Sequence, residues 1–196
     1  MADMLPTVRT ATRGDRQAVM SVLSLAFAAD PVFRYWWRTA DDYLEWGTRF
    51  ALAMGERAFE TGAATMTADQ SAAALWLPPG IEPDPAKLKA LDLPGDPESD
   101  AIAAELRSEM ARFHPTAPHW YLWMIGVDPA RKGQGLGSAL LRHTLSLCDA
   151  RGETAYLESS SPANVPLYQR HGFEPLGVIE VRDVPPIIPM IRRPAS

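Results

Sequence analysis

Apolar residues in the first part of the chain recur with the periods of short strands and of helices that bury one face. Thr12 and Asp15 have the spacing of a capping box, and the apolar residues after them recur every three to four positions. The sequence predicts a strand at 7–11, a helix that ends at Asp30-Pro31, a second helix at 41–60, and strands at 62–68 and 71–77 joined by a turn at Asp69-Gln70.

Prolines dominate the middle of the chain. Six of them fall between residues 78 and 97. Because proline lacks a backbone donor and disrupts helix interiors, an irregular insertion is predicted at about 78–100. Helical periodicity returns at 101–113.

The second half of the chain has the pattern of a β-α-β unit followed by a hairpin. Residues 119–127 are apolar almost throughout, as in a strand covered on both faces. The elements predicted after it are a helix at 136–150, a strand at 154–159, a short helix at 165–171 that ends at Gly172, and a hairpin of 173–182 and 187–192 in which Pro189 suits an edge strand. This order of elements predicts an α/β fold in a single domain.

A glycine-rich turn connects the apolar strand to the helix after it. Residues 131–137 read Arg-Lys-Gly-Gln-Gly-Leu-Gly. Glycines permit unusual backbone angles and the close approach of a phosphate, and a helix N-terminus adds a partial positive charge. The turn is therefore predicted to hold a phosphorylated cofactor.

The turn departs from two well-known nucleotide-binding motifs. A Walker-type loop would end in Lys-Ser or Lys-Thr, which is absent, and a dinucleotide fingerprint starting at Gly133 would need glycine where Ser138 stands. Glu158 lies about where a dinucleotide-binding fold places its ribose-binding acid, but too few β-α units follow for such a fold. A glycine-rich turn that binds no ligand is the remaining alternative.

Two motifs, in this order and at this separation, resemble the GNAT superfamily of N-acetyltransferases. The run Lys132-Gly-Gln-Gly-Leu-Gly137 resembles its coenzyme A loop, Arg/Gln-x-x-Gly-x-Gly/Ala, with lysine at the first position. Asn164 and the segment 167–173 resemble its second motif, Asn…Leu-Tyr-x-x-x-Gly-Phe. The resemblance covers residues 119–175 well, and over its full length the chain most resembles the actinobacterial group that includes the puromycin acetyltransferases.

This resemblance implies a fold, a co-substrate and a set of contacts. The expected fold is α/β, with a central mixed sheet of about seven strands flanked by helices. The expected co-substrate is acetyl-CoA, bound without a metal and mainly through backbone amides. The residues expected to contact it are Val127, Lys132, Gly133, Gln134, Gly135, Leu136, Gly137, Ser138 and Asn164.

Three of the residues around the expected cofactor site have a predicted local role. Amides near Val127 are expected to hold the acetyl carbonyl, and Gly126 to permit a bulge that opens the strand there. Asn164 is also placed to cap its helix.

Acetyl transfer to an amine requires a neutral amine and a protonated leaving thiol. An alkylamine has a pKa of about 10.4, so holding it neutral at pH 7 costs roughly 4–5 kcal/mol. Glu158 is the candidate base, because a carboxylate near the end of an apolar strand is partly desolvated. Tyr168 is the candidate general acid, since the tyrosine of the resembling family donates to the departing sulfur. The alternatives are a structural glutamate and a tyrosine that only fills the core.

Aromatic residues are concentrated after the first predicted helix. Six lie in the fourteen positions from 33 to 46, more than one helix face can bury. In the resembling family this region shapes the acceptor pocket, so Trp36 and Trp37 are predicted to line a pocket for an amine with an aromatic or apolar body. Asp30 stands where the puromycin-acetylating group has a tyrosine, so it is a further pocket residue. The predicted acceptor is a small-molecule primary amine, such as an antibiotic or aminonucleoside.

Composition and charge narrow the possible partners, location and metal content of the protein. The chain has 196 residues, 46% of them hydrophobic, and a net charge of −5, which argues against a nucleic acid partner. No run is long enough to span a membrane, and Met1–Pro6 lack the features of a secretion signal, so a cytoplasmic protein is expected. The single cysteine, Cys148, falls on a buried helix face. His114 and His119 have no further ligand at metal-binding spacing, so no metal site is expected.

The predicted function is direct transfer of the acetyl group from acetyl-CoA to a primary amine in a ternary complex, without a covalent enzyme intermediate. The alternative is a non-catalytic acetyl-CoA-binding sensor, which would use the same loop but would not need both Glu158 and Tyr168. A homodimer formed through the exposed edge of the last hairpin is also left open.

Overall fold

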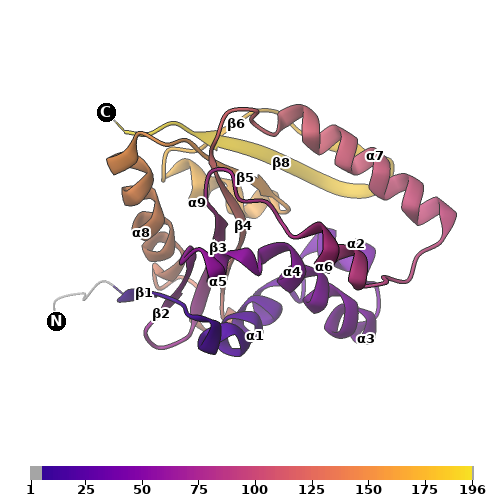
Figure 1. Ribbon diagram of the computed structural model, residues 1–196, viewed down its shortest axis with the longest axis horizontal. Coiled ribbons are helices and arrows are strands. Elements are labelled where there is room, and N and C mark those ends of the chain that lie inside the picture. The colour runs from indigo at the N-terminus through magenta and orange to yellow at the C-terminus, as the bar shows by residue number, and fades with distance from the viewer. Residues whose placement is uncertain (1–5, 196) are drawn as a thin grey trace.

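Eight strands form one mixed sheet within residues 6–195, the part of the chain that this computed structural model describes (Figure 1). Their order is β1-β2-β3-β4-β5-β8-β6, and β7 pairs with β8 beside this path. The strands are β1 (Val8–Thr10), β2 (Ala64–Thr67), β3 (Ala72–Leu77), β4 (Trp120–Val127), β5 (Ala155–Ser159), β6 (Glu174–Pro175), β7 (Ile179–Val181) and β8 (Val184–Arg192). The predicted α/β fold with a mixed sheet is confirmed, with one strand more than expected. The segment Met1–Leu5, which entered the prediction about secretion, lies outside the described residues.

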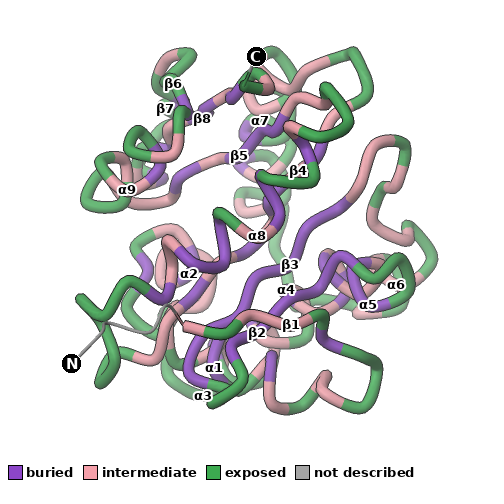
Figure 2. The backbone as a smooth tube through the Cα atoms, turned by 90° about the vertical axis from the view of Figure 1, so that its left-hand side faces the viewer, coloured by how far each residue is buried: buried purple, intermediate pink, exposed green. Residues whose placement is uncertain are grey.

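Helices cover both faces of this sheet. They are α1 (Arg16–Phe27), α2 (Pro31–Trp36), α3 (Ala40–Asp42), α4 (Thr48–Gly55), α5 (Arg57–Glu60), α6 (Pro85–Ala90), α7 (Pro97–Phe113), α8 (Leu136–Arg151) and α9 (Val165–Gln169). Alternate residues of β3 pack into two different hydrophobic clusters, one on each face of the sheet, because successive strand residues point to opposite faces. Trp76 packs with residues of α8, whereas Leu75 packs with residues of α1, α4 and α5. The central strands are consequently the most buried part of the backbone (Figure 2).

A third cluster lies beside the main sheet. α2 and α7 pack there against β7 and β8, with Ile102 and Leu106 of α7 against Ile179 and Ile187. In the described part of the chain no helix is long and apolar enough to span a membrane.

A β-bulge in β4 opens the sheet. Leu75 pairs with Met124 and Trp76 with Leu122, so Trp123 has no partner in β3. On the other side, β4 pairs with β5 only from Trp120 to Leu122. The two parallel strands therefore diverge beyond Leu122, and their diverging ends lie beside the glycine-rich turn.

The predicted bulge at Gly126 is wrong. Gly126 pairs in register with Ala73, and the bulge lies three residues earlier. A Cβ atom at Gly126 would lie 2.6 Å from the Cβ of Ala26 and 3.0 Å from Leu23 Cδ2. The glycine is thus required for the close packing of α1 on β4.

The proline-rich insertion is more regular than predicted. It contains α6, and α7 begins at Pro97, four residues before the predicted start. Asp84 and Asp96 cap these helices by accepting N–H bonds, and a proline follows each of them in the first turn, where its missing N–H is not needed. The prolines therefore mark helix starts within the insertion.

Two further helix predictions need correction. The helix predicted at 41–60 is divided into α3, a π-helical turn at Tyr43–Gly47, α4 and α5. Gly47 packs against the ring of Trp37, and a Cβ atom there would lie 3.0 Å from Trp37 Cε3. Asp30 follows α1 as predicted, but it also caps a further helix, α2.

The last hairpin differs from the prediction in its pairing. β8 lies between β5 and β6, so Pro189 is not on an edge strand, and it pairs with Glu158 of β5. The carbonyl of Pro189 accepts the N–H of Leu176. The N–H and C=O of one residue in an antiparallel strand point to the same side, so the N–H that Pro189 lacks would also face β6. β6 has only two residues and ends before this position. Because β6 is so short, this edge offers little backbone to a second chain.

Candidate active site

A cavity of about 600 Å³ lies where β4 and β5 diverge. Its walls come from the end of α1 and the start of α2, the end of β4, the glycine-rich turn, the first turn of α8, and α9 with the loop before it. The predicted site residues that line it are Asp30, Val127, Lys132, Gly133, Gly135, Leu136, Gly137, Ser138, Asn164 and Tyr168. The fold thus gathers most of the predicted cofactor residues and the candidate acid around one space.

The turn and the start of α8 present unpaired backbone donors to this cavity. Gly133 and Gly135 have φ of +79° and +75°, values that favour glycine. The N–H of Ala139 donates to the carbonyl of Gly135, and Gly135 has no side chain to cap the helix. The N–H groups of the first turn, residues 136–138, are consequently available to an anion.

Side chains of the turn have separate roles. Arg131 Nε donates to Gln134 Oε1 over 3.0 Å, and its guanidinium lies 3.1 Å from Asp69. Gln134 thus braces the turn from outside the cavity. Lys132 lines the cavity beside these groups and adds positive charge.

The end of β4 presents further donors. Asp128 N–H bonds to Ser71 of the loop before β3. Because backbone groups in an antiparallel pair point alternately toward and away from the partner strand, those of Val127 point away from β3, toward the cavity. Asn164 also lines the cavity, and it is the N-cap residue of α9 as predicted, although its side chain makes no capping bond to the helix.

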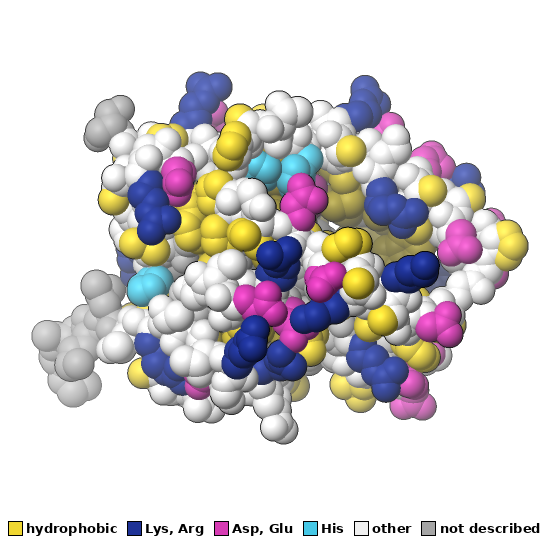
Figure 3. All heavy atoms as spheres, in the orientation of Figure 1, with side chains coloured by type: hydrophobic (Ala, Val, Ile, Leu, Met, Phe, Trp, Pro, Cys, Tyr) yellow, Lys and Arg dark blue, Asp and Glu magenta, His cyan; other side chains and the backbone are white. Residues whose placement is uncertain are grey.

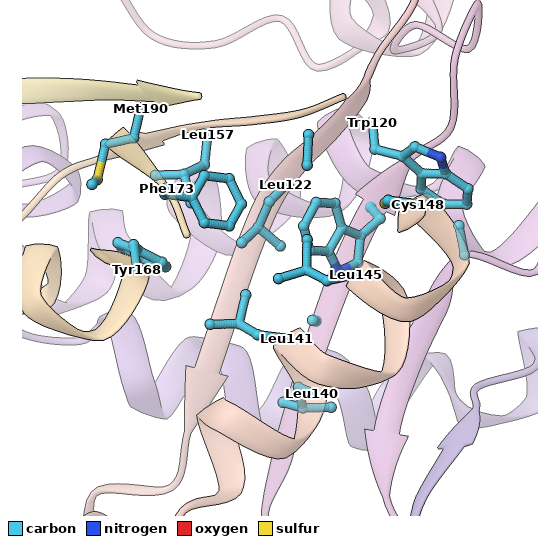
Figure 4. Packing of buried hydrophobic residues seen from close by; sticks show 14 of the residues in the cluster. Trp120, Leu122, Leu140, Leu141, Leu145, Cys148, Leu157, Tyr168, Phe173 and Met190 are labelled. Carbon is cyan, nitrogen blue, oxygen red and sulfur yellow. The ribbon is translucent and has the colours of Figure 1, made fainter. Parts of the chain in front are cut away.

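Tyr168 of α9 borders the cavity while its ring packs in the core beside Phe173 (Figure 4). Burial, and secondarily the charge of Asp30, raise the pKa of the Tyr168 hydroxyl above its ordinary value. The phenol therefore keeps its proton at neutral pH and remains an O–H donor.

Asp30 is a buried carboxylate in the wall of the same cavity. It accepts the N–H groups of Val32 and Phe33 and the hydroxyl of Ser160. Burial raises the pKa of Asp30, although these donors oppose the shift. The side chain therefore joins α2 to the segment after β5 and places negative charge near Tyr168.

Glu158 lies behind the cavity, on the sheet face opposite α8. Its carboxylate accepts the hydroxyl of Tyr121 over 2.6 Å and that of Tyr156 over 3.0 Å, and its side chain is 5% exposed. Burial and the Glu158 charge raise the pKa of both tyrosines, so both remain O–H donors. His114 lies beside this group, with Nδ1 3.9 Å from Glu158 Oε1.

Sequence reasoning did not identify the tyrosines around Glu158. Tyr121 and Tyr156 meet because β4 and β5 pair in parallel register at these residues. The alternation of Tyr156 with Glu158 on one strand was the available signal, since both side chains must share a face.

Aromatic rings connect the cavity with Glu158. Neighbouring rings have centroids 5.2–6.3 Å apart. In order, this aromatic strip consists of Phe27, Phe33, Trp37, Phe50, Trp123, Tyr121 and Tyr156. Trp37 is thus part of the strip but does not line the cavity, and Trp36 packs in the third cluster with Tyr35.

Cys148 does not line the cavity. Cys148 is fully buried, and burial raises the pKa of its thiol to about 12. Among residues 6–195, no group of three or more His, Cys, Asp and Glu side chains is arranged to hold a metal ion.

The chain is similar in sequence and in fold to known acetyltransferases. The sequence profile of the acetyltransferase (GNAT) family matches residues 92–173. Among solved structures, the crystal structure of histone acetyltransferase HPA2 and related acetyltransferase from Corynebacterium glutamicum has a chain with 30% sequence identity to this one. The two chains superpose with a TM-score of 0.66, and the match covers 98% of each.

Two curated relatives show how far the similarity extends. Peptidyl-lysine N-acetyltransferase YjaB of Salmonella typhimurium is 29% identical over 53% of this chain and 82% of its own length. N-alpha-acetyltransferase RimI of Mycobacterium tuberculosis is 40% identical over 35% of this chain and 44% of its own length. For several other curated relatives, the match spans less than a third of their length.

Proposed function

This chain belongs to the acetyltransferase (GNAT) family, and we propose that it transfers the acetyl group of acetyl-CoA to the primary amine of a small molecule. It is an acyltransferase, and acetyl-CoA is the co-substrate of its family. The observation that carries the proposal is the cavity between β4 and β5, where unpaired amides, a basic side chain and Tyr168 meet.

The chain supplies a fitting cradle for the co-substrate. The amides of residues 136–138 would bind the pyrophosphate, and Lys132 would add charge. Asn164 would contact the pantetheine arm, and the backbone at Val127 would donate to the acetyl carbonyl as charge develops on it.

The acceptor would approach from the aromatic strip. Figure 3 shows a hollow with hydrophobic walls where, in the orientation of Figure 1, α7 crosses above α2 and α6. Within the aromatic strip, the ring of Trp123 lies between those of Phe50 and Tyr121. Such walls suit an amine with an apolar or aromatic body, and Asp30 adds a carboxylate near the cavity.

Two residues would handle protons. Glu158 would take the proton of the incoming ammonium through the hydroxyl of Tyr121, which already bonds to its carboxylate. Tyr168 would donate to the sulfur of the departing thiol. Direct attack in a ternary complex follows, because the buried thiol of Cys148 is not suited to act as a nucleophile.

The decisive experiment combines titration with turnover. Isothermal titration with acetyl-CoA, with NADH as the control, measures cofactor binding. Thiol release is then followed with a panel of amines that includes puromycin, an arylalkylamine and a lysine peptide.

Each outcome has one meaning. Acetyl-CoA binding with thiol release for a small amine supports the proposal, and release only with the peptide would redirect it to protein acceptors. Binding without release for any amine would favour a non-catalytic acetyl-CoA sensor. No binding of acetyl-CoA would refute the assignment of the cavity.

A further inference from the structure

We propose that His114 receives the proton that Glu158 takes from the acceptor amine and releases it to water, while His119 holds His114 in the tautomer that can do so. This inference rests on the proposed function, because it requires Glu158 to act as the base.

Glu158 needs an exit for its proton. Its carboxylate is nearly buried, and both hydroxyls that contact it already donate to it. The hydroxyl of Tyr121 leads back to the amine, and that of Tyr156 already donates to the carboxylate, so neither leads the proton to solvent. His114 is the neighbour that leads outward, since its side chain is 38% exposed.

Contacts with rings on two strands hold His114 in place. Its ring lies edge-on to Tyr121 and Tyr156, with centroids 5.2 and 4.8 Å away. It follows directly after α7, and its Nδ1 lies 3.9 Å from Glu158 Oε1. This gap exceeds a hydrogen bond, so a bridging water or a small ring rotation would complete the path.

The hydrogen bonds of His119 fix which nitrogen of His114 carries a proton. His119 Nδ1 lies 2.8 Å from the carbonyl of Ala117, which can only accept, so this nitrogen is the donor. Burial lowers the pKa of His119, so its ring stays neutral and its Nε2 is an acceptor. His114 Nε2, 3.0 Å away, must then donate. In neutral His114 the nitrogen without a proton is therefore Nδ1, and its lone pair faces Glu158.

The proton transfer is balanced without a further reagent. The O–H bond of protonated Glu158 breaks as an N–H bond forms at His114 Nδ1, which leaves an imidazolium beside a carboxylate. The Nδ1 proton then passes to water, and both groups return to their starting states. Histidine side chains reach the surface on this face of the molecule, so water has access to them (Figure 3).

The titratable groups facing His114 favour proton transfer from Glu158 to His114. They are Tyr121 of β4, Tyr156 and Glu158 of β5, and His119 of the loop before β4. Both tyrosines are neutral, so Glu158 is the one charged group among the four at neutral pH. An imidazolium at His114 would lie beside the Glu158 carboxylate, which would stabilise it.

The test uses the full chain with the best acceptor found in the amine panel. His114→Gln should lower kcat on the order of 10²-fold, a typical contribution of a proton-transfer group, with the KM for acetyl-CoA unchanged. His114→Ala should regain activity when imidazole is added, because the ring it lost was partly exposed. His119→Phe, which keeps a ring but removes the acceptor, should lower kcat less.

The control variant is His143→Gln, in α8 and outside this group, which should change none of these values. If His114→Gln folds and keeps the wild-type kcat while Glu158→Gln is inactive, the proton leaves by another route and the inference is wrong. If Glu158→Gln is fully active, the base assignment fails. If the wild-type protein shows no amine-dependent thiol release, the proposed function itself fails.

Discussion

At the scale of single residues, the hydroxyl of Tyr168 has the most specific proposed role. Tyr168→Phe removes that oxygen and keeps the ring that packs beside Phe173. We expect kcat to fall about 10²-fold, in the range measured for general acids, with acetyl-CoA affinity little changed. Steady-state thiol release and isothermal titration measure the two quantities.

Tyr43→Phe is the matched control for this substitution. Its buried hydroxyl donates to the carbonyl of Ser24, so its loss should cost about 1 kcal/mol of stability and leave kcat unchanged. A Tyr168→Phe enzyme that turns over at the wild-type rate would show that Tyr168 only fills the core.

The buried carboxylate of Asp30 makes a prediction about pH. Burial raises its pKa, so the folded state favours the protonated form, and the stability that this adds at low pH is lost as pH rises through the raised pKa. Asp30→Asn keeps a good N-cap and removes the buried charge. We expect it to unfold at a higher temperature than the wild type at pH 7, with the difference vanishing below about pH 4, near the ordinary pKa of aspartate.

Asp30→Ala separates the cap from the charge. It loses the bonds to Val32 and Phe33, so it should lose about 1 kcal/mol relative to Asp30→Asn at every pH. Thermal unfolding from pH 3 to pH 8 decides the matter, and an Asp30→Asn variant less stable than the wild type at pH 7 would contradict the argument.

At the scale of elements, the packing of α1 on β4 depends on one glycine. In Gly126→Ala the new Cβ would meet Ala26 at 2.6 Å, so α1 or β4 must shift. Overpacking of this kind costs about 1–3 kcal/mol. Because β4 also borders the cavity, kcat should fall together with the stability measured by denaturant unfolding.

Gly14→Ala tests whether any added methyl group would do the same. Its Cβ would make only an ordinary contact, 3.5 Å from Thr12 Oγ1. We expect a change near zero, and equal losses in the two variants would rule out the α1–β4 contact as the cause.

Elements set by local pattern were predictable, and those set by distant contacts were not. The strand-turn-helix around Gly133 and Gly135 follows from local backbone requirements, so its residues were found from the sequence. The start of α7 at Pro97 was missed because the prolines were read as breakers and not as first-turn residues. The bulge at Trp123 depends on pairing with β3, which no local pattern in β4 shows.

The candidate site divides in the same way. Tyr168 was found through a local motif, whereas the partners of Glu158 come from β4 and from the residues after α7. His114 and Tyr121 meet Glu158 only after the strands have paired, so each looked unremarkable in the sequence. Trp36 and Trp37 were predicted to line the pocket for the same reason, because their packing partners lie on distant elements that the sequence does not reveal.

At the scale of the whole molecule, the divergence of β4 and β5 joins two chemically different regions. One side holds the amides of α8 and Lys132, which suit an anion, and the aromatic strip leads from there to the buried carboxylate of Glu158. A bound cofactor would contact α8, β4 and α9 together. Its binding should therefore stabilise the fold as a whole.

This coupling gives the last prediction. Acetyl-CoA at 100 times its Kd should add about 2.7 kcal/mol to the stability of the wild type, and a chain of this size gains roughly 2–4 °C in Tm per kcal/mol. Gly135→Ala, at φ +75°, should lose about 1–2 kcal/mol without ligand and most of the shift with ligand. Gly152→Ala, at φ +66° at the other end of α8, should lose a similar amount without ligand and keep the full shift. Thermal unfolding with and without acetyl-CoA compares the three proteins, and equal ligand shifts in both variants would mean that the turn before α8 does not hold the cofactor.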